Sequence, residues 1–327
     1  MTVSARKKTI KAVIPAAGLG TRMLPATKVI PKEMLPLAGK PLIQYAVEEA
    51  AASGIETVIV VVRNQKSTIQ EHFARDRELE SLLEGRRLAD AAEGIRRLPG
   101  LANLQYVEQE KPLGLAHAIS CARPLLGDGP FVVLLPDVIM VHDEPVTRQL
   151  IAAHELHGES VIAIRALRST EVERYGIVRA EPSAALHIGN SVRVTGLVEK
   201  PPTATAPSLL GVFGRYLLHP GIWDVLAEAP PDVRGEVQLT DALNLLCQKR
   251  PLFGFCFDGL HYDAGNHLGY LSASIELSLR DPYLRLPLLE YLSHPPKPYG
   301  KHEGDKPTTY QLKDENRKMK QLLADLG

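Results

Sequence analysis

The apolar positions in the first half of the chain fall into two alternating patterns. Short β-branched runs predict buried strands, and between them apolar residues recur at helical spacing. The predicted strands are Ile10–Pro15, Thr57–Val62, Leu104–Val107, Phe131–Leu135 and Ser160–Ala166, and the predicted helices are Lys40–Ser53, Ser67–Arg75, Glu78–Ala92, Leu115–Ala122 and Pro145–His157. This alternation indicates an α/β fold with a Rossmann-like, mostly parallel mixed sheet flanked by helices.

The second half of the chain has shorter strands separated by turns, which predict a smaller β-rich portion. These strands are Tyr175–Ala180, Val192–Val198, Gly211–Leu217 and Leu252–Phe257, and the helices between and after them are Pro220–Ala229, Gln238–Lys249 and His267–Arg280. From Asp281 the pattern weakens. We therefore expect one globular domain at residues 9–280 and a partly flexible C-terminal extension at residues 281–327.

That extension begins without a clear pattern of its own. Residues 294–310 are rich in Pro, Gly, Lys and Thr, which is typical of a linker or a surface segment. The charged run Lys313–Leu326 predicts a short helix.

Charge and composition exclude several classes of protein. The chain has 38 basic and 38 acidic residues and no formal net charge, which disfavours a protein that binds nucleic-acid polymers. No apolar run reaches the ~18 residues of a membrane span, so we expect no membrane association. Three widely spaced cysteines, Cys121, Cys247 and Cys256, favour free thiols in the cytoplasm over a disulfide framework.

The first predicted strand leads into a glycine-containing loop followed by three cations. Gly18 and Gly20 allow the backbone N–H groups of such a loop to approach an anion, and Arg22, Lys28 and Lys32 add positive charge. An ordinary strand-to-helix turn with solvated cations would have the same local pattern. A dinucleotide-binding fingerprint, as in a Rossmann dehydrogenase, would need glycine where Met23 stands, and a Walker loop would need Gly-Lys-Ser/Thr, which is absent.

A longer run around this loop resembles a known family. Four short motifs follow one another between residues 18 and 45: Gly18-Leu-Gly-Thr-Arg22, Pro25-Ala-Thr-Lys28, Pro31-Lys-Glu-Met-Leu-Pro36 and Lys40-Pro-Leu-Ile-Gln-Tyr45. This series is similar to the signature of the sugar-1-phosphate nucleotidyltransferases, and most of all to that of the bacterial UTP–glucose-1-phosphate uridylyltransferases. The resemblance covers roughly residues 9–280, which makes that region the expected nucleotidyltransferase domain.

The resemblance implies a nucleotide site built from the loop and from a second segment after the third predicted strand. It assigns nucleotide binding to Ala16, Ala17, Gly18, Gly20 and Thr21, and it makes Arg22 and Lys32 catalytic cations for the phosphates. It also assigns recognition of the base to Gln109 and Gly114. An amide with both donor and acceptor atoms suits the edge of a pyrimidine.

The same resemblance implies a metal site and a sugar site. Asp137 follows a predicted buried strand, where ligands bind in open α/β sheets, and the resemblance makes Asp137 and Asp263 ligands of Mg²⁺. It makes Gly176, Glu199 and Lys200 contacts of the sugar phosphate.

The implied reaction is UTP plus glucose 1-phosphate giving UDP-glucose and pyrophosphate, in a homodimer or homotetramer. Ala116 in Gly114-Leu-Ala-His-Ala118 is similar to the thymidylyltransferases instead, so a glucose-1-phosphate thymidylyltransferase is an alternative. A non-catalytic regulatory paralogue that binds nucleotide sugars is another.

Overall fold

The computed structural model describes residues 10–63, 68–181 and 190–294. The chain forms two compact units, residues 1–278 and 279–327. Residues 295–327 lie outside the described residues. They include all but the first residue of the predicted linker at 294–310 and the whole predicted helix Lys313–Leu326.

A nine-stranded sheet forms the centre of the first unit, in the order β5-β4-β1-β6-β11-β8-β12-β10-β9. Its strands are β1 (Lys11–Ala16), β4 (Thr57–Val62), β5 (Asn103–Glu108), β6 (Phe131–Leu134), β8 (Ser160–Ala166), β9 (Gly176–Ala180), β10 (Ser191–Glu199), β11 (Leu210–Leu218) and β12 (Leu252–Cys256). The four strands from β5 to β6 are parallel, and β11, β10 and β9 introduce antiparallel pairs. The predicted mixed sheet is therefore confirmed. Its run of four parallel strands lies at the end that the N-terminal half builds, and β8 and β12 form a further parallel pair.

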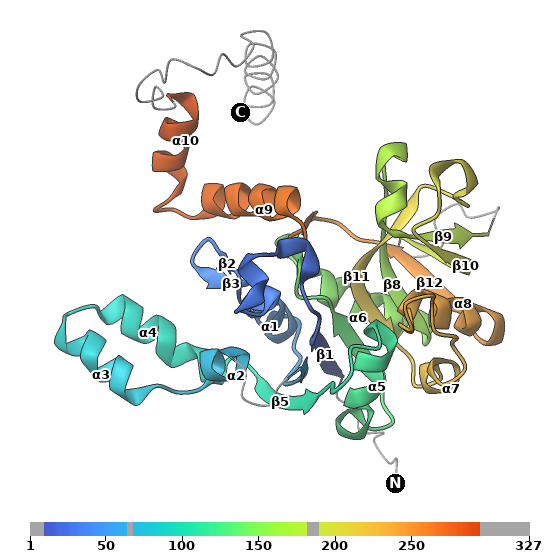
Figure 1. Cartoon of the computed structure of the whole chain (residues 1–327), viewed down its shortest axis with the longest axis horizontal. Helices are drawn as coiled ribbons and strands as arrows, with labels where there is room; N and C mark the ends of the chain where they lie inside the picture. Colours follow the sequence, from blue (N-terminus) through green and yellow to red (C-terminus); the bar gives the residue numbers. More distant parts are fainter. Residues whose placement is uncertain (1–9, 64–67, 182–189, 295–327) are drawn as a thin grey trace. The chain divides into compact units, whose positions relative to one another are not determined.

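Helices cover both faces of this sheet (Figure 1). Along β1, Val13 belongs to one hydrophobic cluster and its neighbours Ala12 and Ile14 to the other, because successive side chains of a strand point to opposite faces. Residues of α5 (Leu115–Leu126), α7 (Ile222–Leu226) and α8 (Leu239–Lys249) join the first cluster, and residues of α1 (Leu42–Ala52), α2 (Thr68–Phe73) and α6 (Val146–His157) join the second. The near-continuous apolar runs of the central strands follow from this double cover.

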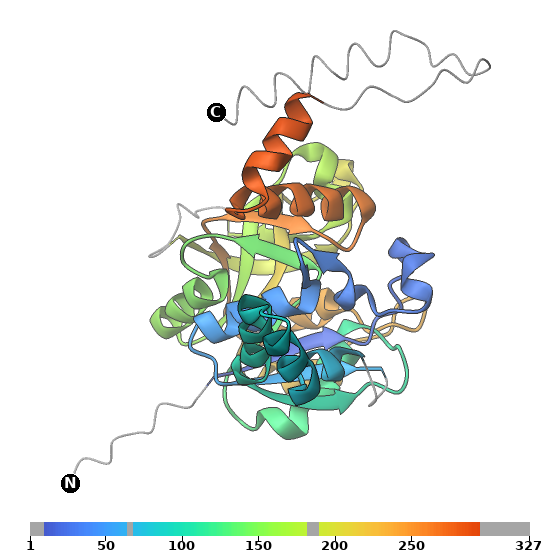
Figure 2. The same ribbon diagram turned by 90° about the vertical axis from the view of Figure 1, so that its left-hand side faces the viewer.

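Two predicted helices are wrong in their extent. The helix predicted at Pro220–Ala229 is limited to α7 (Ile222–Leu226), and the helix predicted at Glu78–Ala92 is divided. The segment predicted as Glu78–Ala92 forms two helices, α3 (Arg77–Gly85) and α4 (Ala89–Arg97), that pack on each other and project from the sheet (Figures 1 and 2). The break lies at Arg87, whose φ of 61° is left-handed and cannot continue an α-helix. Helical spacing continues across the break, so the pattern alone did not reveal it.

Several short elements were not predicted. A two-stranded antiparallel sheet pairs β7 (Val138–Val141) with β13 (Leu260–Asp263). The other elements that were not predicted are β2 (Pro36–Leu37), β3 (Lys40–Pro41), the helix α10 (Arg285–Ser293), and the 3-10 turns η1 (Thr21–Met23), η2 (Ala26–Lys28), η3 (Lys32–Met34), η4 (Leu98–Gly100), η5 (Ser169–Arg174) and η6 (Thr203–Thr205). The helix α9 (His267–Arg280) has the bounds that were predicted for it. None of the described helices is long and apolar enough to cross a membrane.

Candidate active site

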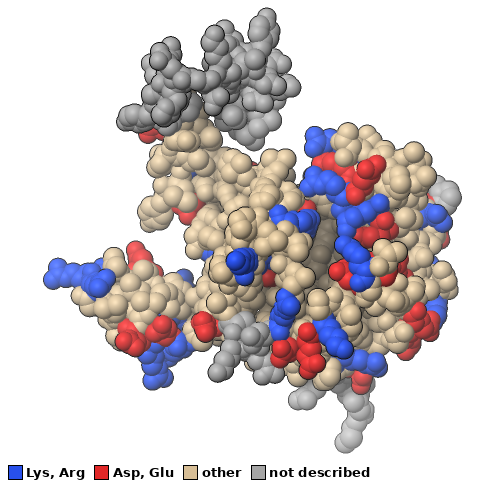
Figure 3. All heavy atoms as spheres, viewed as in Figure 1, with Lys and Arg blue, Asp and Glu red and all other residues tan. Residues whose placement is uncertain are grey.

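Two cavities lie side by side at the edge of the sheet where the parallel strands end. The first has a volume of about 450 Å³ and the second about 230 Å³. Leu115, Leu135 and Asp137 line both, so the cavities meet at Asp137. Figure 3 shows a hollow in one face of the molecule with Lys and Arg side chains around its rim. Such a pair of joined, cation-rimmed cavities can hold two anionic reactants with their reacting ends in contact.

The loop after β1 forms one wall of the first cavity. Ala17, Gly18, Gly20 and Thr21 line it, as the sequence predicts, whereas Ala16 is buried in the core and does not line it. Gly20 has a φ of 61°, and a Cβ there would lie 3.1 Å from the Lys32 side chain. The loop therefore needs glycine at this position for its backbone conformation and for its close packing on η3.

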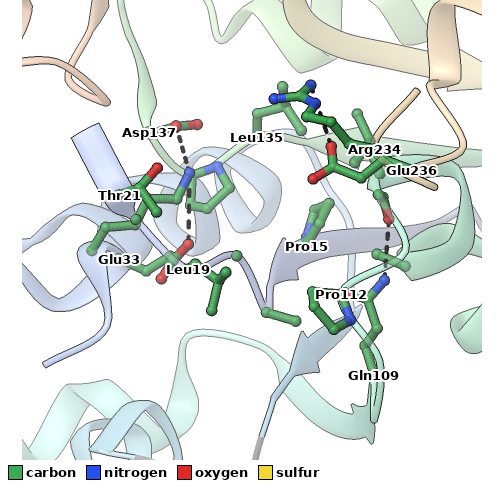
Figure 4. A pocket seen from close by; sticks show the side chains of 18 residues that line it. Pro15, Leu19, Thr21, Glu33, Gln109, Pro112, Leu135, Asp137, Arg234 and Glu236 are labelled. Carbon is green, nitrogen blue, oxygen red and sulfur yellow. Dashed lines mark hydrogen bonds and ion pairs between the residues drawn. The ribbon is translucent and has the colours of Figure 1, made fainter. Parts of the chain in front are cut away.

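Gln109 and Gly114 lie at the opposite end of the first cavity (Figure 4 labels Gln109). The Gln109 Nε2 donates to the Gly114 carbonyl oxygen at 3.1 Å and lies 2.9 Å from His117 Nδ1. Gly114 has a φ of 93°, and a Cβ there would lie 2.7 Å from the backbone oxygen of Val237. The segment around Val237 thus requires Gly114, in addition to any ligand that approaches it.

Charged groups gather at the other end, where the cavities meet. Lys32 Nζ lies 2.7 Å from Asp137 Oδ2, and Arg22 lies 3.8 Å from the same oxygen. Burial alone would raise the pKa of the Asp137 carboxyl, but Lys32 and Arg22 outweigh it and the pKa is lowered. Burial alone would lower the pKa of Lys32, but Asp137 and Glu33 outweigh it and the pKa is raised. Both members of the pair are therefore charged.

Glu33 also lines the first cavity, although no role was predicted for it. Its side chain is fully buried, 3.9 Å from Lys32, and neither carboxylate oxygen has a hydrogen-bond partner among the described residues. Burial raises its pKa to about 7. Glu33 can therefore gain or lose a proton near neutral pH.

Asp137 and Asp263 converge from different parts of the chain. Asp137 directly precedes β7 and Asp263 ends β13, and the pairing of these strands sets Asp263 opposite Val138. Arg22 lies 3.8 Å from Asp137 and 3.7 Å from Asp263. A Cβ on Gly265 would lie 2.6 Å from Asp137 Oδ2 and 3.0 Å from Asp263 Oδ1, so this glycine leaves the space between the two carboxylates open.

This donor set fits magnesium. Mg²⁺ takes oxygen ligands and is usually held by one or two carboxylates together with substrate phosphates. Within the described residues there is no group of three or more His, Cys, Asp or Glu side chains that could hold a metal by themselves. Two carboxylates where the cavities meet are therefore a ligand set that could hold Mg²⁺ together with a phosphate-bearing ligand.

The second cavity brings together the three predicted sugar-phosphate residues. Gly176, Glu199 and Lys200 line it, with Arg174 and Thr240, which were not predicted. Glu199 accepts a hydrogen bond from Thr240 Oγ1 at 2.7 Å and lies 2.8 Å from Lys200 Nζ. A Cβ on Gly176 would lie 3.3 Å from Glu199 Oε2, so glycine keeps this carboxylate accessible.

Arg174 adds a further cation to this cavity. It lies 3.8 Å from Asp263 and its side chain is about half exposed. With Lys200 it can offset the charge of a sugar phosphate. No motif marks Arg174 in the sequence, because its role depends on where η5 sits against β13.

The buried ion pair between Arg215 and Glu49 packs against the turn that contains Asp137. Arg215 donates to Glu49 with an Nη2–Oε2 distance of 2.6 Å, and it also donates to the carbonyls of Leu135 and Val138 at 2.9 and 3.0 Å. Those two carbonyls flank Pro136 and Asp137. Burial alone would raise the pKa of Glu49, but Arg215 and Thr147 outweigh it and the pKa is lowered. The ion pair therefore joins α1 and β11 to the turn that carries Asp137.

Comparison with known proteins agrees with this geometry. The profile of the nucleotidyl transferase family matches residues 11–278. A UTP–glucose-1-phosphate uridylyltransferase, YngB of Bacillus subtilis, is 45% identical over 287 residues, which cover 88% of this chain and 95% of that protein.

Two solved structures are similar over most of their length. A UTP-bound UGPase from Acinetobacter baumannii is 36% identical, with a TM-score of 0.81, and the match covers 88% of this chain and 99% of that one. A UDP-glucose pyrophosphorylase in complex with UDP-glucose is 36% identical, with a TM-score of 0.74 over 83% of this chain and 99% of that one. The resemblance read from the Gly18–Tyr45 segment is thus confirmed, and the chain belongs to the nucleotidyl transferase family.

Proposed function

We propose that this protein transfers the uridylyl group of UTP to α-D-glucose 1-phosphate, giving UDP-glucose and pyrophosphate. The observation that carries the proposal is the meeting of two cavities at Asp137, one lined by Gln109 and the other by Glu199 and Lys200. The names of the relatives, at 45% and 36% identity, support UTP as the nucleotide over dTTP.

The nucleotide would lie in the first cavity, with its base at Gln109 and Gly114 and its phosphates toward the loop after β1. Gly18 and Gly20 allow backbone N–H groups to reach phosphate oxygens. Lys32 would hold nucleotide phosphate, and Arg22 would stabilise the leaving pyrophosphate.

The sugar phosphate would lie in the second cavity. Glu199 would accept hydrogen bonds from sugar hydroxyls, the Gly176 backbone would approach the ring, and Lys200 would pair with the phosphate. A phosphate oxygen of the sugar phosphate attacks the α-phosphorus of UTP in line. The bond from that phosphorus to the bridging oxygen breaks as the new one forms, and both electrons of the broken bond leave with pyrophosphate.

This chain contributes positioning and charge to that reaction, without a covalent enzyme intermediate. We further propose Mg²⁺ as the cofactor, held by Asp137 and Asp263. When bound, it would offset negative charge on the α-phosphate and orient it.

The test is pyrophosphate release with UTP, dTTP, CTP, ATP and GTP, each against glucose, galactose and N-acetylglucosamine 1-phosphates. We expect the highest kcat/KM for UTP with glucose 1-phosphate. A preference for dTTP would assign the thymidylyltransferase alternative instead. Binding of UDP-glucose without turnover of any pair would assign the regulatory one.

We also propose that the chain assembles as a homodimer or homotetramer. Leu268 and Leu271 on α9, Tyr283 just before α10, and Leu286 and Tyr291 on α10 are large apolar side chains with more than half of their surface exposed. Apolar surface of this kind favours association. Sedimentation velocity at micromolar concentration tests the proposal, and a monomer at all concentrations would contradict it.

A further inference from the structure

The side-chain amide of Gln109 is held by two contacts inside the protein. Gln109 is buried, with 4% of its surface exposed, and it lines the first cavity. Its Nε2 lies 3.1 Å from the Gly114 carbonyl oxygen and 2.9 Å from His117 Nδ1. What these contacts leave available on the amide decides which base it can accept.

The Gly114 contact fixes which way the amide faces. A backbone carbonyl oxygen can only accept a hydrogen bond, so the NH₂ group must lie on its side. The opposite orientation would place the Gln109 Oε1 against the Gly114 oxygen, with two acceptors facing each other. The second contact then follows from the first, because the same nitrogen faces the imidazole.

His117 must therefore present an acceptor to Gln109. An imidazole nitrogen accepts only when it carries no proton, so the ring proton of neutral His117 lies on Nε2 and the lone pair on Nδ1 points to the amide. Cys121 Sγ is the other atom near Nδ1, at 3.9 Å. Together, Gly114 and His117 use both hydrogens of the amide.

Only the acceptor oxygen of Gln109 then remains for a ligand. No contact recorded among the described residues donates to Oε1. Uracil and thymine present a donor at N3, whereas cytosine presents a lone pair at the same position. An acceptor on the protein pairs with the first and repels the second.

We propose that His117 is a positioning residue that sets the choice of pyrimidine through Gln109, so that the site accepts uracil or thymine and rejects cytosine. The inference rests on the proposed function, since it assumes that the nucleotide base lies at Gln109. It adds a residue from the first turns of α5 whose effect on specificity comes through the orientation of another side chain.

The test compares His117→Asn with His117→Gln. The Asn side chain can place an acceptor oxygen where Nδ1 lies, whereas the Gln side chain is one carbon longer and carries its amide beyond that position. Both variants introduce the same functional group and remove the imidazole. His117→Ala removes the acceptor altogether, and Cys121→Ala is the control that removes the other neighbour of Nδ1.

The readouts are kcat/KM for UTP and for CTP with glucose 1-phosphate, and the dissociation constants of UDP and CDP by calorimetry. We expect His117→Ala and His117→Gln to lower the ratio of kcat/KM for UTP to that for CTP by about tenfold or more. The loss should come from a higher KM for UTP with little change in kcat. His117→Asn and Cys121→Ala should keep the wild-type ratio, and the ratio of UDP to CDP affinity should follow the same order.

An unchanged UTP-to-CTP ratio in both His117→Ala and His117→Gln would overturn the inference. Equal loss in His117→Asn and His117→Gln, with matching thermal melting, would overturn it too, because only size and packing would then matter. Failure of wild-type protein to use UTP at all would instead contradict the proposed function.

Discussion

The Glu33 carboxylate lies buried beside Lys32, with no hydrogen-bond partner on either oxygen among the described residues. A buried carboxyl whose pKa is raised to about 7 holds its proton in the folded protein between about pH 4.5 and 7, where the unfolded chain has released it. Its contribution to stability is therefore full below about pH 4.5 and is lost as the pH rises toward 7.

This loss of stability with rising pH predicts a difference between wild-type protein and Glu33→Gln, whose side chain cannot titrate. The free energy of unfolding of wild-type protein should fall, relative to the variant, by on the order of 3 kcal/mol between pH 4.5 and 8. Chemical denaturation of ligand-free protein at pH 4.5, 6, 7 and 8 measures the difference. The control is Glu228→Gln, which removes an exposed carboxylate paired with Lys249. Parallel curves for wild type and Glu33→Gln would contradict the prediction.

A second prediction concerns Glu199 in the sugar cavity. Glu199→Ala removes the acceptor for sugar hydroxyls and leaves Lys200 and Thr240 without their partner. We expect kcat/KM for glucose 1-phosphate to fall by about one to two orders of magnitude, equivalent to about 1–3 kcal/mol. The KM for UTP should change little. Steady-state kinetics with each substrate varied in turn separate the two, and unchanged glucose 1-phosphate kinetics would remove Glu199 from the site.

Most of the residues that line the two cavities and belong to a recognisable motif were predicted from the sequence. Residues that reach the cavities only through contacts between distant segments were missed. Gln109 and Gly114 line the first cavity, as expected from the sequence. The close packing of Val237 on Gly114, which leaves no room for a side chain at position 114, involves a segment more than a hundred residues away. Glu33 stands inside the recognised motif, yet only the packed structure shows that its carboxylate is buried without a hydrogen-bond partner among the described residues. Burial and long-range contact are what a single sequence does not show.

Among the elements, β7 and β13 illustrate the same limit. Each has four residues, and each pairs with a partner some 120 positions away in the chain. Neither is part of the main sheet, and so short a run has too little alternation to predict a strand. The long buried strands β1 and β4 were predicted within one residue at each end, because double burial gives them a continuous apolar run.

A third prediction concerns the Arg215–Glu49 ion pair, which joins β11 and α1 to the turn that contains Asp137. Arg215→Met removes the buried partner of Glu49 and the two donors to the carbonyls of Leu135 and Val138. Leaving a buried charge unpaired costs about 3–5 kcal/mol, so the unfolding free energy should fall by that order. The double variant Arg215→Met/Glu49→Leu should recover part of the loss, because it leaves no unpaired charge.

Kinetic measurements on the double variant separate the effect of the ion pair on the position of Asp137 from its effect on stability. If the double variant folds, its Mg²⁺ concentration for half-maximal turnover should still exceed that of wild type, since the carbonyls at 135 and 138 have lost their donors. Thermal melting and turnover against Mg²⁺ concentration measure the two effects. A double variant with wild-type stability and wild-type Mg²⁺ dependence would show that the ion pair has no part in positioning the turn.

For the whole molecule, the first unit holds every residue that lines the two cavities. We predict that a chain ending at Ser293 folds and keeps its activity, because it retains that unit and both helices α9 and α10. Circular dichroism, sedimentation velocity and turnover compare it with the full chain. Insolubility or loss of the oligomer after this truncation would show that residues 294–327 are structural.

The two cavities meet only because the fold joins distant parts of the chain. Asp137 follows β6 in the parallel half of the sheet, and Asp263 ends β13 after the β-rich portion. Both lie near Arg22, and Gly265 keeps the space between them open. The convergence of these carboxylates is thus a property of the architecture, and a test of the metal site is a test of that architecture.

The last prediction replaces each carboxylate by an amide of the same shape. Asp137→Asn and Asp263→Asn each remove one negative charge where the α-phosphate would lie, so kcat should fall about 10²-fold or more. Asp137→Asn should also lower stability above the carboxyl's unfolded pKa, because the ion pair with Lys32 lowers the pKa of Asp137 in the folded state. Asp263→Asn should melt closer to wild type, because Asp263 lies 3.7 Å from Arg22 and 3.8 Å from Arg174 and has no contact as short as that of Asp137 with Lys32.

Two measurements check this separation. Turnover against Mg²⁺ concentration gives the catalytic effect, and calorimetry of UTP binding with and without Mg²⁺ gives the metal's contribution to affinity apart from turnover. Both variants should bind UTP without Mg²⁺ at least as well as wild-type protein, because a like charge has been removed from beside the phosphates, and both should lose the gain in affinity that Mg²⁺ brings. Near-normal turnover of either variant at limiting Mg²⁺ would remove that residue from the metal site and leave its ion pairs with neighbouring cations as the reason for its position.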